Sequence, residues 1–280
     1  MELLITKGAS LDEKDNDGVT ALMWASYKGH RECMELLITK GASLYEKDNR
    51  GNTTFVYVSR YGHRECMELL ITKGARINEK DNDCWTAFMW ASTHGHRECM
   101  ELLITKGARI NEKDIHGTTA LMWASRNGHR ECMDLLITKG VNVNVKNYAG
   151  ATALMWASFE GHRECMALLI TKGANVNEKD NDGATALMWA SGEGHRECMA
   201  LLIAKGANVN EKDNDGDTAL MYASMNSRHE CAALMLHAQR REAIRAMLSA
   251  RFAARRFADD AFLAVLVDEV SRLAYSPVEP

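Results

Sequence analysis

Residues 18–50 read GVTALMWASYKGHRECMELLITKGASLYEKDNR, and residues 183–215 read GATALMWASGEGHRECMALLIAKGANVNEKDND. The two stretches agree at most positions, and similar units fill the chain between them at a constant step of 33 residues. The units begin at Gly18, Gly51, Cys84, Gly117, Gly150, Gly183 and Gly216. A period of this length predicts a stacked array, because one unit alone cannot bury its apolar face.

Local signals predict two helices and a finger in each unit. In the first unit Thr20 is a good N-cap for a short helix, which Gly29 ends. Residues 31–40 carry apolar side chains at helical spacing, and Gly41 suits the C-terminus of that second helix. Residues 42–50 are polar and predict an extended finger with a β-turn. The fold class is therefore an all-α repeat solenoid of helix–loop–helix units with β-turn fingers.

Seven of the eight cysteines follow the same step, and Cys84 stands outside the series. The series is Cys33, Cys66, Cys99, Cys132, Cys165, Cys198 and Cys231. Equivalent residues of stacked helices lie about 8–10 Å apart, which is too far for a disulfide, whose Cα atoms lie within about 7 Å. We expect these cysteines to be small buried apolar residues in a reducing compartment.

Composition excludes several classes of protein. The chain has 280 residues, a net charge of −4, 46% apolar and 26% charged residues, which is typical of a globular protein. Its apolar runs are far shorter than the ~20 residues of a membrane span, and no signal peptide is visible. We expect a cytoplasmic protein, with the nucleus as the alternative. An isoelectric point near 6.2 argues against a nucleic-acid partner.

The repeat resembles the ankyrin repeat over about residues 1–238. Matching positions in one unit are Asp48, Gly51, Thr53, Gly62, His63, Leu69, Leu70, Gly74, Ala75 and Asn78. The proline of the family pattern is Ala21 here, and its histidine in the same tetrapeptide is Met23. The resemblance implies a solenoid whose concave face binds proteins. It also implies that a histidine such as His63 bonds backbone in the loop between two helices.

The ends of the chain depart from the pattern. Residues 1–17 form a half repeat, which is either an imperfect cap or the rest of a unit that starts upstream; we favour the second. Residues 239–280 leave the repeat and predict two amphipathic helices, which serve as a cap of the array or as a docking segment. Residues 239–256 carry six Arg against one Glu, whereas residues 257–280 have a net charge of −4.

Two features of the units give further expectations. Cys84 stands where the other units have a turn glycine, so its backbone must enter a region that normally favours glycine. A column of aromatic residues occupies a position that is aliphatic core in the family, so we expect it to be core as well. The column consists of Trp24, Tyr57, Trp90, Trp123, Trp156, Trp189 and Tyr222.

No catalytic or cofactor motif emerges. Each unit places a His and a Cys three residues apart, as at His30 and Cys33, which is a conceivable metal pair. Repetition in every unit argues against one unique site, and the loop and core roles of the two positions explain them. We expect no metal, no cofactor and no enzymatic activity.

Variation between units concentrates beside the turn glycine and at the end of the first helix. There the units carry residue types that dominate binding hot spots. The candidate partner-binding residues are Tyr27, Arg60, Tyr61, Trp85, His94, His116, Arg126, Tyr148 and Phe159. Six of them, Arg60, Tyr61, Trp85, His94, Arg126 and Phe159, should form one concave strip, because a fixed offset in each unit returns to one face. The competing explanation is unselected drift on a tolerant surface.

The sequence thus predicts a monomeric, non-catalytic scaffold that binds a protein partner through the concave face. One alternative is a substrate receptor whose C-terminal helices dock an effector such as a ubiquitin-ligase subunit. An alternative from a different class is an enzyme with a cryptic site.

Overall fold

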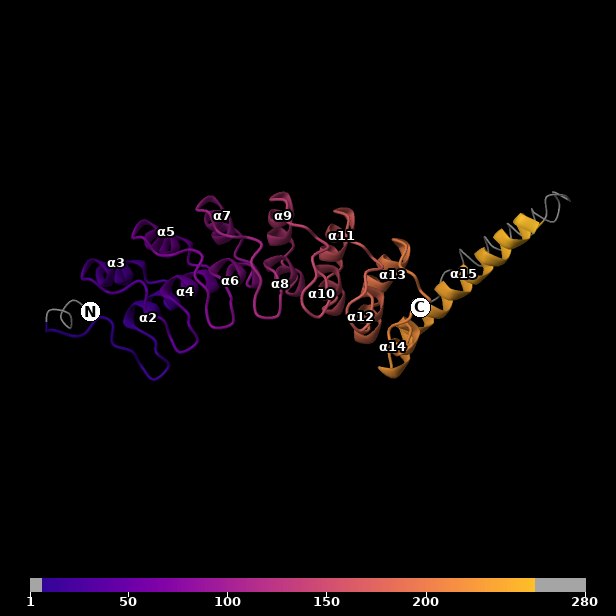
Figure 1. Cartoon of the computed structure of the whole chain (residues 1–280), viewed down its shortest axis with the longest axis horizontal. Coiled ribbons are helices and arrows are strands. Elements are labelled where there is room, and N and C mark those ends of the chain that lie inside the picture. Colours follow the sequence, from indigo (N-terminus) through magenta and orange to yellow (C-terminus); the bar gives the residue numbers. More distant parts are fainter. Residues whose placement is uncertain (1–6, 255–280) are drawn as a thin grey trace.

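A computed structural model describes residues 7–254 as fourteen helices joined by loops and fingers (Figure 1). The helices are α2 (Ala21–Lys28), α3 (Arg31–Thr39), α4 (Thr54–Arg60), α5 (Arg64–Thr72), α6 (Ala87–Thr93), α7 (Arg97–Thr105), α8 (Ala120–Arg126), α9 (Arg130–Thr138), α10 (Ala153–Phe159), α11 (Arg163–Thr171), α12 (Ala186–Glu193), α13 (Arg196–Ala204), α14 (Ala219–Met225) and α15 (His229–Ala254). The repeat solenoid predicted from the 33-residue period is confirmed.

The helices stack in two rows. The first helices of successive repeats pack on one another from α2 to α14, and the second helices form a parallel row from α3 to α15. The array curves, and the row of first helices lies on the inner side of the arc together with the fingers (Figure 1). Short antiparallel bridges such as Lys47 with Thr53 close the fingers. The inner face is therefore built from first helices and fingers.

Threonine starts the first helix of each repeat. In α2 the Met23 N–H donates to Thr20 Oγ1 at 3.3 Å, and the Thr20 N–H donates to Met23 Sδ at 3.5 Å. The thioether thus accepts the return bond of a capping box. Gly29 ends the helix with a φ of 70°. Methionine therefore contributes to the cap at the position where the family pattern has histidine.

A column of histidines ties each repeat from the second to the sixth to the preceding one. His63 Nε2 donates to the carbonyl of Tyr27 at 3.0 Å, and the equivalent bond recurs at His96, His129, His162 and His195. The ring lies directly on Gly29, where a Cβ would stand 2.6 Å from His63 Nδ1. The backbone role that the resemblance implied for these histidines is therefore confirmed.

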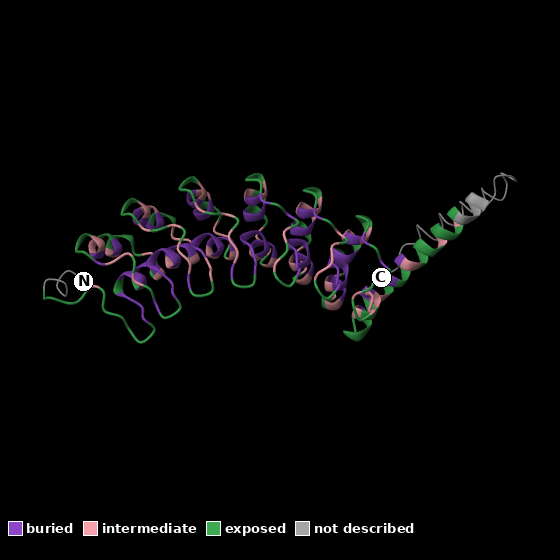
Figure 2. Cartoon of the chain, viewed as in Figure 1, coloured by how far each residue is buried: buried purple, intermediate pink, exposed green. Residues whose placement is uncertain are grey.

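The core is made of repeated Leu, Met, Ala and Cys positions. Figure 2 shows buried residues in each repeat from α2 to α14. All eight cysteines are unpaired, and six of the seven periodic ones are buried. Cys33 is only half-buried, because no described helix precedes its repeat. Burial raises the pKa of the Cys99 thiol to about 12 and that of Cys132 to about 11.

The expectation that the aromatic column belongs to the buried core is wrong, although Trp156, Trp189 and Tyr222 pack against that core while partly exposed. Trp24 is 49% exposed. The equivalent aromatic residues at Tyr57, Trp90, Trp123, Trp156, Trp189 and Tyr222 are half-buried. Except at Trp156, their polar N–H and O–H groups donate to finger carboxylates, and these bonds hold the rings at the inner face of the array.

Among residues 7–254, two positions other than glycine have a positive φ. Cys84 has a φ of 62°, as its place in the turn predicted, and Ser227 has a φ of 56°. In both cases a side chain occupies a conformation that L-residues adopt at a cost. The last repeat therefore replaces its loop glycine with a strained serine.

The C-terminal end departs from the repeat geometry. Helix α15 has 26 residues and runs without a break across residue 238, where we expected the array to end. The second amphipathic helix expected after residue 256 lies outside the described residues, as do residues 1–6 of the half repeat. Within residues 7–254 no helix is both long and apolar enough to cross a membrane.

Candidate functional site

The inner face is organised by a bond between most of the column aromatics and the finger that immediately precedes each of them in the chain. Trp90 Nε1 donates to Asp81 Oδ2 at 3.2 Å, while Asp81 Oδ1 accepts the backbone N–H of Trp85 at 2.8 Å. Each carboxylate thus holds a finger turn and a ring together. The same indole bond links Trp24 to Asp15, Trp123 to Asp114, and Trp189 to Asp180, and Tyr57 and Tyr222 make it through their hydroxyls.

Trp156 is the exception. Its partner position holds Asn147, whose Oδ1 accepts the Ala151 N–H at 2.9 Å. The remaining polar atom of that amide is a donor, and it cannot accept the indole N–H. Trp156 Nε1 is accordingly buried without a hydrogen-bond partner among the described residues.

Variable side chains connect the column aromatics of the first three repeats. The Tyr27 ring lies 5.7 Å from Trp24 and 4.6 Å from Tyr61, edge to face in both pairs. The Arg60 guanidinium lies 5.7 Å from the centre of the Tyr61 ring and 4.4 Å from that of Trp90. Contacts of this kind are cation–π interactions. They carry the aromatic surface without interruption from α2 to α6.

Trp85 carries the surface into the middle of the array. Its ring centre lies 4.4 Å from Trp90 in its own repeat and 4.6 Å from Trp123 in the next. His94 stacks on the outer part of the same cluster, with its ring 5.8 Å from Trp90 and tilted by 29°. Trp85 is thus the bridge between the third and fourth repeats.

The second half of the array continues the pattern. The Arg126 guanidinium lies 5.6 Å from the Trp123 ring and 4.7 Å from Trp156. Trp156 meets Trp189 at 5.4 Å, and Phe159 lies 6.3 Å and 5.6 Å from these two rings. We call the connected set the aromatic strip. It comprises Trp24, Tyr27, Arg60, Tyr61, Trp85, Trp90, His94, Trp123, Arg126, Trp156, Phe159 and Trp189.

The structure places all six residues expected on one strip within this set, and Tyr27 joins them. His116 and Tyr148 lie elsewhere, at neighbouring finger tips, where the Tyr148 N–H donates to the His116 carbonyl at 3.0 Å. Tyr148 is 67% exposed, and its ring covers Gly117. The column tryptophans that link the strip were not among the residues expected on this face; they are Trp24, Trp90, Trp123, Trp156 and Trp189. The available signal was the acidic residue that stands nine positions before most of them.

Two equivalent arginines of the strip differ in charge balance. Arg126 Nε pairs with Glu160 at 3.2 Å, one repeat further along. The residue related to Arg60 in the same way is His94, which supplies no carboxylate. Arg60 Nε is buried without a hydrogen-bond partner in the described part of the chain. Arg60 therefore lies on the Trp90 ring without a carboxylate partner among the described residues.

Within residues 7–254 no three His, Cys, Asp or Glu side chains are grouped so as to hold a metal ion. Burial lowers the pKa of His96 and His129, which favours their neutral form in the loops. These histidines serve the packing of the repeats.

Comparison with known proteins agrees with this architecture. The family model for ankyrin repeats in three copies matches residues 1–48, 40–114, 74–147, 113–180 and 154–246. The crystal structure of the human ASB11 ankyrin repeat domain is similar over 78% of this chain and 98% of that chain, with a TM-score of 0.71 and 25% identity. No curated protein matches the sequence.

Stacked helix pairs with β-turn fingers and a continuous inner surface define a helical-repeat protein. The matches across residues 1–246 show which kind: the chain belongs to the ankyrin-repeat family. Ankyrin repeats are generally scaffolds for protein–protein interaction, and the fold is typically non-catalytic.

Proposed function

We propose that this chain is a non-catalytic recognition module that binds one protein partner through the aromatic strip. The observation that carries the proposal is the strip itself. Aromatic and arginine side chains run in unbroken contact across six repeats, on a face that stays partly open to solvent. Large apolar surfaces of this kind mark interaction sites, and Tyr, Trp and Arg dominate binding energy. Tyr61, 38% exposed, is after Trp24 the most accessible large apolar side chain of the strip.

The absence of a carboxylate partner for Arg60 among the described residues favours a contact with an acidic group of the partner protein. A cation held on Trp90 without a carboxylate gains most from an anionic group that the partner brings. Arg126 would gain less from an anionic group of the partner, because it already forms an ion pair with Glu160. We therefore expect a partner segment that places an acidic side chain at Arg60, beside an apolar or aromatic residue at Tyr61 and Trp85.

Other parts of the proposal concern the setting in which the protein works. Eight unpaired thiols suit a reducing compartment, so we place the protein in the cytoplasm, with the nucleus as the alternative. The net charge of −4 favours a protein partner over nucleic acid. We expect the chain to act as a monomer. The receptor alternative depends on residues 239–280, most of which lie outside the described residues.

Selection of binders from a random peptide library displayed on phage tests the proposal. The binders are then titrated against Tyr61→Ala and against Tyr45→Ala. Tyr45 is a matched control because it is 48% exposed and belongs to no contact of the strip. Tyr61→Ala should weaken binding by about 2 kcal/mol or more, which is about 30-fold, whereas Tyr45→Ala should leave it unchanged. Binders that lose equal affinity in both variants, or in neither, contradict the proposal.

A second substitution tests the acidic contact. His94→Glu supplies to Arg60 the carboxylate that Glu160 supplies to Arg126. It should remove the preference for acidic peptides while binders without an acidic residue keep their affinity. If His94→Glu keeps the preference for acidic peptides, Arg60 is not the residue that binds the acidic group. That result would concern Arg60 alone, because the Tyr61→Ala titration tests the strip as a whole.

A further inference from the structure

Gly192 lies in the last turn of α12, one turn after Trp189, where the aromatic strip ends. All 20 glycines of the chain lie within residues 7–254, and all of them except Gly192 have a positive φ. A positive φ favours glycine, whereas a helix disfavours it. The backbone therefore gives no reason for a glycine at position 192.

Side chains at the equivalent position of other repeats lie against the column aromatic of the next repeat. The Arg126 guanidinium lies 4.7 Å from the Trp156 ring and 5.6 Å from Trp123 in its own repeat. Arg60 and Phe159 reach the next repeat in the same way. Gly192 has no side chain that could continue this series into the seventh repeat.

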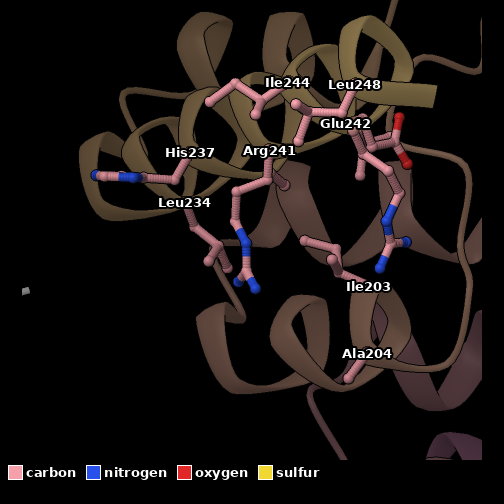
Figure 3. Close-up of a pocket in the computed structure, with 11 residues that line it drawn as sticks. Ile203, Ala204, Leu234, His237, Arg241, Glu242, Ile244 and Leu248 are labelled. Carbon is pink, nitrogen blue, oxygen red and sulfur yellow. The ribbon is translucent and has the colours of Figure 1, made fainter. Parts of the chain in front are cut away.

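The missing side chain leaves a gap beside Tyr222, the column aromatic of the last repeat. A Cβ at position 192 would stand 3.5 Å from Tyr222 Cδ1 and 3.6 Å from Asn226 Nδ2, which are ordinary van der Waals distances. A side chain therefore fits there, and Gly192 is only half-buried. The gap is separate from the groove of about 690 Å³ between α13 and α15, whose lining includes Ile203 and Leu234 (Figure 3).

Carboxylates predominate at this end of the inner face. Burial is the largest cause that raises the pKa of Tyr222, and the charges of three carboxylates raise it further. These are Asp213, Asp217 and Asp180. Against them stands Arg228, whose Nε donates to the Gly192 carbonyl at 3.3 Å. The balance of charge around the gap is therefore negative and favours a cation.

Glu193 adds a carboxylate that lacks a cation. Arg126 pairs at 3.2 Å with Glu160, which stands 34 residues later. The residue 34 positions before Glu193 is Phe159, which has no charge. Glu193 is exposed and forms no ion pair with another described residue. The strip thus presents an unpaired cation at Arg60 and, four repeats further along, an unpaired carboxylate.

We propose that the gap at Gly192 binds an arginine or lysine side chain of the protein partner, which lies on the Tyr222 ring and pairs with Glu193. The inference rests on the proposed function, because it adds a second anchor for the same partner. The contact repeats what Arg126 does within the chain, where a guanidinium lies on aromatic rings and pairs with a carboxylate. A partner segment then has a defined direction, with its acidic residue at Arg60 and its basic residue at the gap.

Filling the gap from within the chain tests its preference without any partner. Gly192→Arg places a guanidinium where Arg126 stands in the fourth repeat, and Gly192→Gln places an uncharged side chain there. Arginine and glutamine have similar helix propensities, so both variants should be more stable than the wild type. The Tm of Gly192→Arg should exceed that of Gly192→Gln by about 2 °C at low salt and by less at high salt. Equal Tm values would overturn the inference and leave the proposed function standing.

Peptide binding tests the contact with a partner. Phage-selected binders of the wild-type chain are compared with versions in which each arginine or lysine is replaced by norleucine. Glu193→Gln should weaken a basic binder about threefold or more, and its norleucine version by less than about 1.5-fold, because only the cation pairs with the carboxylate. Asp134→Asn is the matched control. It makes the same change in net charge but lies exposed on α9, in the row of second helices, and should leave both affinities unchanged.

The outcomes separate this inference from the proposed function. Binders that lose affinity in Tyr61→Ala but not in Glu193→Gln, or that contain no basic residue, overturn the inference and leave the proposed function standing. Equal losses in Glu193→Gln and Asp134→Asn, or equal losses for the two versions of a peptide, overturn the inference as well. Binders that keep their full affinity in Tyr61→Ala overturn both.

Discussion

Asn147→Asp should stabilise the protein by giving Trp156 the hydrogen-bond acceptor that it lacks. The other column tryptophans donate to a finger carboxylate at 2.9–3.2 Å, whereas Trp156 Nε1 is buried and unpaired. A net hydrogen bond to a charged group contributes about 1.5–3 kcal/mol when buried. The ring is half-buried, so we expect a gain of about 1–1.5 kcal/mol in the free energy of unfolding. For a chain of this size that corresponds to a rise of about 3 °C in Tm.

The assay is thermal and urea denaturation of the full chain, with two matched variants. Asp180→Asn removes the same acceptor from Trp189 and should cost a similar amount. Trp156→Phe keeps a ring but removes the N–H, so Asn147→Asp in that background should give no gain. Equal stabilisation by Asn147→Asp with and without the indole N–H would refute the reasoning, because the gain would then come from charge alone.

Three further outcomes follow from burial and backbone conformation. Under native conditions a thiol reagent should label Cys84 and Cys33 before the other cysteines, because the remaining six are buried; mass mapping of the modified peptides checks this, and rapid labelling of Cys132 would contradict it. Cys84→Gly should raise the free energy of unfolding by about 0.5–1 kcal/mol, because it removes the backbone strain of a non-glycine residue at φ 62°. A loss of stability in urea denaturation would contradict this and would show that packing of the thiol outweighs the strain. Burial lowers the pKa of His96 and His129, so the unfolded chain binds more protons in mild acid. Stability contributed by these histidines should be complete above pH about 6.5 and fall as the pH drops below it. Urea denaturation at a series of pH values checks this, and the slope should be smaller in His129→Asn.

The fold could be predicted from sequence because its determinants are local and repeated. Thr20 caps a helix and Gly29 ends it within ten residues, and the same signals recur in the other units. The 33-residue period then determines that equivalent helices of successive repeats pack on one another. Cys84 shows the same principle, since its place in the turn alone predicted its positive φ.

The aromatic column could not be placed in the same way. Its apolar character suggested a core position, but the polar edge of each ring finds its partner in a finger nine residues earlier, as Trp90 does with Asp81. That bond holds the ring at the inner face. The difference between Arg60 and Arg126 depends on a contact with the next repeat, which residue type alone does not reveal. Cys33 is only half-buried for a similar reason, because the burial of this position depends on a neighbouring repeat and not on its own repeat.

The tryptophans of the chain offer the most direct test of the central claim. All six, Trp24, Trp85, Trp90, Trp123, Trp156 and Trp189, belong to the aromatic strip, so intrinsic tryptophan fluorescence reports on that surface alone. The ligand is a selected peptide, or a partner protein, that contains no tryptophan. It is titrated into the chain while acrylamide quenching of the tryptophan fluorescence is measured. Binding at the strip predicts lower quenching that saturates with the bound fraction. A ligand that binds with unchanged quenching would contradict the claim that the strip is the recognition surface.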